Sequence, residues 1–163
     1  MMIVIDTDIL SMFAKVDAID ALKKLFKDCI VMTPKIRDEI SIPLEYGYTF
    51  PLNVISKIGT VPLSPSALKE YERLSENWTL GKGELEAISY CKTENGIFLT
   101  NDKKARELAK NKGVRVISLQ AILRALWKTG IKTKEETTKI LERIKEIDNL
   151  YISPESESEI FKE

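Results

Sequence analysis

Short runs of apolar, mostly β-branched residues recur along this chain and alternate with segments of helical periodicity. An apolar run without polar interruption is typical of a strand that is buried on both faces of a sheet. Strands that alternate with helices imply right-handed crossovers and a parallel sheet covered on both faces. The sequence therefore predicts a three-layer α/β/α fold with a central parallel sheet of four to five strands. The predicted strands are Met2–Ile5, Cys29–Met32, Ile97–Thr100 and Val114–Ile117, with Ile58–Leu63 as an edge strand.

The length of 163 residues and the hydrophobic content of 44% suit one domain with a proper core. We expect that domain over residues 1–150, followed by an acidic, flexible tail over residues 151–163, because Ser153–Glu163 is rich in serine and glutamate. The segment Ser41–Pro51 is predicted to be an irregular or partly helical excursion. Its aromatic side chains either pack on the core or offer a surface to a substrate or partner.

Composition excludes several classes of function. The chain has no histidine, so it holds neither a Ser-His-Asp nor a Cys-His nucleophile system, and no histidine-ligated zinc. Its 25 Lys and Arg balance 25 Asp and Glu, which argues against strong non-specific nucleic-acid binding but leaves room for a local basic patch.

Localisation is predicted from the cysteines and from the opening residues. Cys29 and Cys91 stand in apolar surroundings and are typical of buried thiols in a cytosolic protein. No basic region precedes Asp6, and no apolar run approaches the length of about 18 residues that a membrane span needs. We expect a cytoplasmic protein without a membrane segment.

Acidic residues stand where the predicted strands end. Asp6 and Asp102 each follow a strand closely, and Glu39 lies one helical turn beyond the strand that ends at Met32. In an open parallel sheet, ligands bind at the carboxyl ends of the strands. Carboxylates gathered there repel each other unless a cation lies among them, and hard oxygen ligands suit Mg²⁺ or Mn²⁺. The pattern predicts metal-assisted chemistry on a phosphate ester.

The helix that follows Gly83 offers one further acid to this edge. Glu84 and Glu86 are two positions apart and face about 200° from each other on a helix, so only one of them suits the site. Periodicity alone does not choose between them. Asp8 either joins the acids or caps its own helix. Asp102 can likewise be a helix cap, and Glu84 can interact with a helix dipole.

These residues resemble the motifs of the PIN domain, the nuclease fold of many VapC-type toxins. The resemblance covers about residues 2 to 148. The motifs of the first, second and last strands resemble Val4–Leu10, Thr33–Glu39 and Thr100–Asp102. Segments similar to a prokaryotic PIN-like subgroup are Leu80–Ile88, Asp102–Arg106 and Ala121–Gly130.

The resemblance implies which residues carry the chemistry. Its catalytic and metal-binding acids fall on Asp6, Glu39, Glu86 and Asp102, with Glu84 as the alternative third acid. That third acid is usually Asp, and aligning Glu86-Ala87-Ile88 with the family's Asp-Ala-aliphatic step favours Glu86. Residues implied to hydrogen-bond the acids or a bound water are Thr7 and Thr100, and Asp8 if it joins them.

The implied activity is hydrolysis of RNA phosphodiesters by an endoribonuclease, with one or two Mg²⁺ or Mn²⁺ ions activating a water. A toxin of this kind would have a small antitoxin partner and form a homodimer. Two alternatives stay open: a non-catalytic module that binds RNA or protein, and a phosphatase of the haloacid-dehalogenase type, whose Asp-x-Asp motif Asp6-Thr7-Asp8 resembles. Basic residues near the acids in sequence either hold RNA phosphates or are solvated: Lys35, Arg37, Lys82, Lys103 and Arg106.

Overall fold

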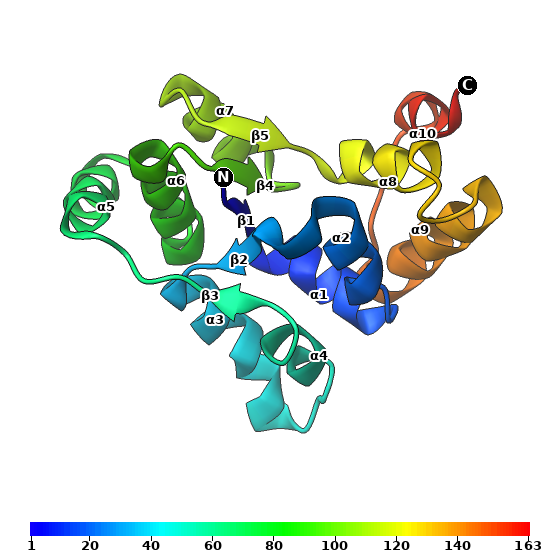
Figure 1. Cartoon of the computed structure of the whole chain (residues 1–163), viewed down its shortest axis with the longest axis horizontal. Helices are drawn as coiled ribbons and strands as arrows, with labels where there is room; N and C mark the ends of the chain where they lie inside the picture. Colours follow the sequence, from blue (N-terminus) through cyan, green and yellow to red (C-terminus); the bar gives the residue numbers. More distant parts are fainter.

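A five-stranded parallel sheet forms the centre of the computed structural model, which describes residues 1–163. The strand order is β3-β2-β1-β4-β5, and every neighbouring pair is parallel. Helices flank the sheet and complete the predicted three-layer α/β/α fold (Figure 1). The strands are β1 (Ile3–Ile5), β2 (Ile30–Met32), β3 (Gly59–Thr60), β4 (Ile97–Leu99) and β5 (Arg115–Ile117).

Each predicted strand lies within about one residue of an observed one, except β3, which is shorter than predicted. Strands β1 and β2 are buried at every position, as their uninterrupted apolar runs predict. Strand β3 is at the edge and both of its residues are exposed. Pro62, which has no backbone N–H, helps to end the pairing there.

The helices fill the connections between the strands. In Figure 1, α5 and α6 form a pair at one end of the sheet, and α8, α9 and α10 gather at the other. The α-helices are α1 (Thr7–Lys15), α2 (Ile19–Phe26), α3 (Pro34–Ser41), α4 (Pro51–Ile55), α5 (Pro65–Asn77), α6 (Lys82–Glu94), α7 (Lys103–Asn111), α8 (Leu119–Lys128), α9 (Lys134–Asp148) and α10 (Pro154–Phe161). Short 3-10 helices are η1 (Lys27–Cys29) and η2 (Ile42–Tyr46). None of the helices combines the length and hydrophobicity needed to cross a membrane.

The C-terminal residues correct one expectation. Instead of a frayed tail, residues 154–161 form α10, which packs against α8 and buries Ile160. The indole N–H of Trp127 donates to the Ile160 carbonyl at 2.7 Å. Arg124 also donates to backbone carbonyls at the end of α10, those of Glu159 and Lys162 among them. These contacts make α10 part of the domain.

Two smaller expectations concern residues outside the sheet. The segment Ser41–Pro51 is partly helical, as predicted, because it contains η2 and the start of α4. Tyr46 and Tyr48 in this segment are exposed. Cys29 and Cys91 are both free thiols; Cys91 is buried as predicted, whereas Cys29 is only half-buried.

Candidate active site

Asp6 occupies the carboxyl end of the central strand β1. Its backbone N–H donates to the Leu99 carbonyl at 2.9 Å, so the residue directly continues the pairing of β1 with β4. Its side chain is only 4% exposed and accepts hydrogen bonds from Thr7 N–H at 2.7 Å and from Thr100 Oγ1 at 2.8 Å. Burial, together with the charges of Asp8 and Glu39, raises the pKa of Asp6 to about 7.

Thr100 joins the two acids that follow β1 and β4. Its hydroxyl donates to Asp6 Oδ2 and accepts from the Asp102 N–H at 3.1 Å. Asp102 is the N-cap of α7, and its Oδ1 accepts from Ala105 N–H at 2.8 Å. Asp102 therefore caps a helix and also lies near other acids, because its charge contributes to the raised pKa values of Asp8 and Glu84.

Glu39 is held at the start of α6 by two hydrogen bonds. Thr7 Oγ1 donates to its Oε2 at 2.7 Å, and Gly83 N–H donates to its Oε1 at 3.0 Å. Gly83 N–H is one of the first N–H groups of α6, which have no partner inside the helix. A Cβ atom at Gly83 would lie 2.5 Å from Glu39 Oε1, so a larger residue there would displace the carboxylate of Glu39 from its present position. Sequence reasoning missed Gly83 as part of the site, although the Gly81-Lys82-Gly83 turn before the helix was a signal for it.

The structure separates Glu84 from Glu86. Glu84 is near Asp6, Asp102 and Asp8, and burial followed by those three charges raises its pKa to about 8. Its Oε2 is buried and has no hydrogen-bond partner. Its position favours Glu84 as the acid that α6 contributes.

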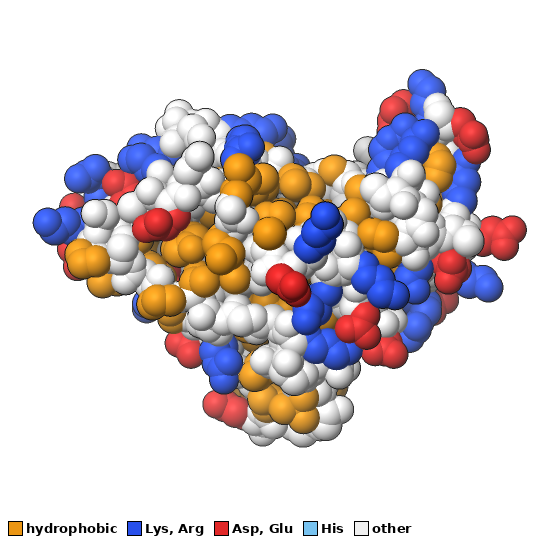
Figure 2. All heavy atoms as spheres, viewed as in Figure 1, with side chains coloured by type: hydrophobic (Ala, Val, Ile, Leu, Met, Phe, Trp, Pro, Cys, Tyr) orange, Lys and Arg blue, Asp and Glu red, His pale blue; other side chains and the backbone are white.

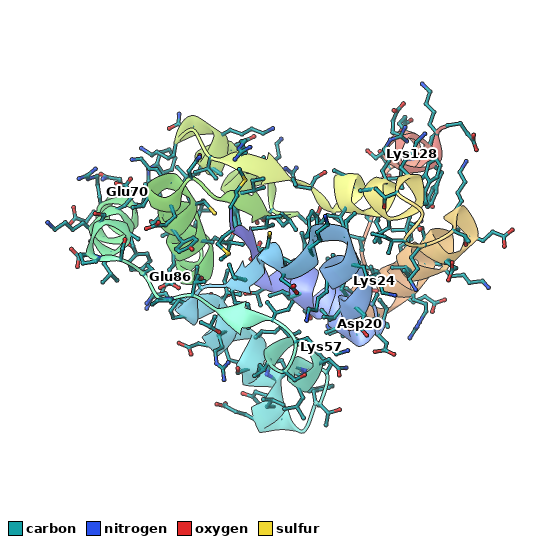
Figure 3. All side chains as sticks on the ribbon, in the orientation of Figure 1. Asp20, Lys24, Lys57, Glu70, Glu86 and Lys128 are labelled. Atoms are coloured by element: carbon teal, nitrogen blue, oxygen red, sulfur yellow. The ribbon has the colours of Figure 1, made fainter.

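Glu86 is also a residue of α6, but its side chain reaches the start of α3 instead (Figure 3). It is 3% exposed, and its Oε1 accepts from the Lys35 N–H at 2.7 Å while Lys35 Nζ lies 3.7 Å from Oε2. Thr33, the N-cap of α3, makes no capping hydrogen bond with its side chain, so Glu86 satisfies the helix end from outside. The preference for Glu86 over Glu84 drawn from the sequence therefore does not agree with this placement.

Asp8 lies in the first turn of α1, whose N-cap is Asp6. The cap interpretation of Asp8 is therefore wrong. Partial desolvation, followed by the charges of Asp102, Asp148 and Glu39, raises the pKa of Asp8. We call the five mutually interacting carboxylates at this edge of the sheet the acid cluster: Asp6, Asp8, Glu39, Glu84 and Asp102.

The chain matches the family model described as PIN domain over residues 2–163. It belongs to the PIN domain family. The match extends beyond residue 150 and includes α10. No curated protein matches the sequence. PIN domains are nucleases in general, and this PIN domain carries its acids at the sheet edge where nuclease chemistry would take place.

The acid cluster suits a hard divalent cation by the chemistry of its donors. All candidate ligand atoms are carboxylate oxygens, and Glu84 Oε2 is a buried oxygen without a partner. Burial and, after it, repulsion by neighbouring acids raise the pKa values of Asp6 and Glu84, and a bound cation would relieve that repulsion. As the side chains stand, no three of the acids converge closely enough to surround one ion.

Proposed function

We propose that this PIN domain is a metal-dependent endoribonuclease. The observation that carries the proposal is the acid cluster itself, whose five carboxylates follow β1 and β4 or lie on α1, α3 and α6. They meet at one sheet edge although burial raises the pKa values of three of them, Asp6, Asp8 and Glu84. A fold that needed only stability would not gather unpaired acids in this way.

In this proposal Asp6, Glu84 and Asp102 hold Mg²⁺ or Mn²⁺, with Asp8 at the exposed side. The bound ion would supply an activated water and neutralise charge on the phosphate, which suits a chain without histidine. Thr100 fixes the carboxylate of Asp6 and the backbone of Asp102. Thr7 and Gly83 both donate to Glu39, so its side chain is held in one orientation. These threonines and the glycine N–H position the acids before any substrate arrives.

A non-catalytic binding module is the second candidate. It is favoured by one observation: the acids do not converge around a single point, and Asp102 Oδ1 is engaged in capping α7. The match to the PIN family leaves the phosphatase alternative without support.

The test is cleavage of a mixed RNA substrate by purified protein with Mg²⁺ or Mn²⁺, compared with EDTA and with Asp6→Asn. We expect metal-dependent cleavage in the wild type and at least a hundredfold slower cleavage in the variant. Circular dichroism of both proteins controls for folding. Folded wild-type protein that binds RNA without cutting it under any metal condition would favour the binding module.

We also propose that the cellular role is that of a toxin, with a small antitoxin protein as partner and a homodimer as the functional form. Support comes from family membership alone. Growth arrest on expression, relieved by the protein encoded beside it, is the expected result.

A further inference from the structure

Helix α7 carries an excess of positive charge that nothing in the fold neutralises. Residues 103–112 contain five Lys or Arg residues and one Glu, in a chain whose total charge is zero. No ion pair of the structure includes any of these five cations. Figure 2 shows basic side chains along the edge of the molecule where Figure 1 places α7. The cations are Lys103, Lys104, Arg106, Lys110 and Lys112.

Two of these cations lie at the end of α7 where positive charge lowers helix stability. Lys103 and Lys104 are the first two residues of α7, next to the positive end of the helix dipole. The only acid at this helix end is the N-cap Asp102, one negative charge beside two positive ones. Exposed residues that lower the stability of their own helix are expected where the surface has a function.

A cavity of about 410 Å³ lies between α7 and the loop that joins α5 to α6. Its volume falls in the range of sites for small ligands or single nucleotide bases. Trp78 forms part of one wall and is 42% exposed, although a tryptophan side chain is usually well covered. The lining residues are Trp78, Thr79, Leu80, Lys104, Glu107, Leu108 and Asn111.

The two walls of this cavity are next in sequence to two acids of the acid cluster, Glu84 and Asp102. Leu80 lies four residues before Glu84, and Lys104 lies two residues after Asp102. Since the charges of Asp102 and Glu84 interact, both walls reach the same sheet edge. One end of the cavity, at Leu80 and Lys104, is therefore close in sequence to two acids of the acid cluster.

We propose that this cavity and α7 bind single-stranded RNA, with one base stacked on Trp78 and the backbone phosphates along the cations of α7. Stacking on an aromatic face accepts any base, and neighbouring cations follow the phosphates. A base inside the cavity cannot be paired, so the site selects single strands over duplexes. Glu107 and Asn111 offer hydrogen-bonding groups to the base edge. The inference rests on the proposed function and names the residues that would hold its RNA.

The charge on α7 is tested by fluorescence anisotropy with a labelled single-stranded RNA of 12 nucleotides. The protein carries Asp6→Asn throughout, so that the RNA stays intact. Lys103→Ala with Lys104→Ala is compared with Lys24→Ala and Lys139→Ala, a pair of exposed lysines that form no ion pair and are on α2 and α9. We expect roughly tenfold weaker binding and a salt dependence shallower by about 1.4 for the α7 variant. Equal affinities for the two double variants would overturn the proposal.

The cavity is tested through Trp78. The chain has two tryptophans, so Trp127→Phe leaves Trp78 as the only one. We expect single-stranded RNA to quench its fluorescence, and a strand of equal charge without bases to leave it unchanged. Trp78→Ala should bind single-stranded RNA about tenfold or more weakly, and Trp78→Phe should restore part of that loss. Equal quenching by the strand without bases, or equal affinity for duplex RNA, would overturn the proposal.

The outcomes separate this inference from the proposed nuclease activity. RNA binding that depends on α7 and Trp78, without cleavage by the wild type, would uphold the RNA site and contradict the nuclease. Metal-dependent cleavage with affinities unchanged in the α7 and Trp78 variants would uphold the nuclease and overturn the RNA site.

Discussion

Gly83 lies directly against the carboxylate of Glu39 in the acid cluster. A methyl group there would overlap Glu39 Oε1, because its Cβ would lie 2.5 Å from that oxygen. Gly83→Ala should therefore displace Glu39 or the start of α6 and slow metal-dependent RNA cleavage about a hundredfold. The matched control is Gly59→Ala, since Gly59 has no heavy atom within 4 Å of the added carbon. Initial cleavage rates decide the matter, and a Gly83→Ala rate equal to the control rate would show that the position of Glu39 is unimportant.

Glu84 and Glu86 should respond in opposite ways to the same substitution. Glu84→Gln removes a charge that burial and three neighbouring acids destabilise, so it should raise the melting temperature in EDTA. It also removes a proposed metal ligand, so it should abolish cleavage. Glu86→Gln keeps an acceptor for Lys35 N–H and should retain cleavage within a few-fold of the wild type. Glu86→Ala removes that acceptor and should destabilise the protein by about 1–3 kcal/mol. Cleavage and thermal unfolding of the three variants test this, and loss of cleavage in a stable Glu86→Gln variant would return Glu86 to the site.

Sequence reasoning found most of the acid cluster but could not choose between these two glutamates. Asp6 and Asp102 were predictable because they directly follow buried apolar runs, and strand ends meet at one edge. The choice between Glu84 and Glu86 depends on a contact with Lys35, which is 51 positions from Glu86. Helical periodicity contains no information about a partner on another helix.

At the scale of single elements, α10 should contribute measurably to stability. Ile160 is 1% exposed, so Ile160→Ala should lower the free energy of unfolding by about 2–4 kcal/mol. Glu155→Ala, an exposed position on the same helix, is the control and should change it by less than about 0.5 kcal/mol. Urea denaturation measures both. An Ile160→Ala variant as stable as the control would mean that α10 is detached in solution.

The strands and α10 show what a local pattern reveals about an element. Strands β1, β2 and β4 were predictable because unbroken apolar runs are typical of strands buried in a sheet. Helix α10 was predicted to be frayed because serine and glutamate dominate its composition. Its local signals were Ser153 as N-cap, Pro154 at the first helical position and Ile160 as the buried residue. Its stability also depends on Arg124 and Trp127 of α8, which are distant in sequence.

For the whole molecule, the acid cluster should make stability depend on both pH and divalent metal. The folded pKa values of Asp6 and Glu84 are about 7 and 8, above their ordinary values of 3.8 and 4.5. The unfolded chain therefore releases these protons at lower pH than the folded chain does. In EDTA, the contribution of these two groups to the free energy of unfolding should be largest below about pH 4. It should fall as the pH rises through 7 and 8.

The expected size of this effect is measurable in a chain that has no histidine, since few other groups titrate between pH 5 and 8. A tenfold change in one protonation equilibrium corresponds to about 1.4 kcal/mol, or roughly 3–6 °C in melting temperature for a domain of this size. We expect melting temperatures in EDTA to fall by at least that amount from pH 5 to pH 8. Mn²⁺ or Mg²⁺ at millimolar concentration should restore the loss at pH 8, because a cation that binds only the folded state stabilises it.

The control for this prediction is the double variant Asp6→Asn with Glu84→Gln. It lacks the two carboxylates with the largest increases in pKa within the acid cluster, so its melting temperature should change little between pH 5 and 8 and should not respond to Mn²⁺. Differential scanning calorimetry of both proteins, with and without the metal, gives four curves to compare at each pH. A wild-type melting temperature that is equal at both pH values in EDTA and unchanged by Mn²⁺ would mean that the five acids are too well solvated to require a cation. The case for metal-dependent cleavage would then lose its physical basis, because the repulsion within the acid cluster is the reason to expect an ion there.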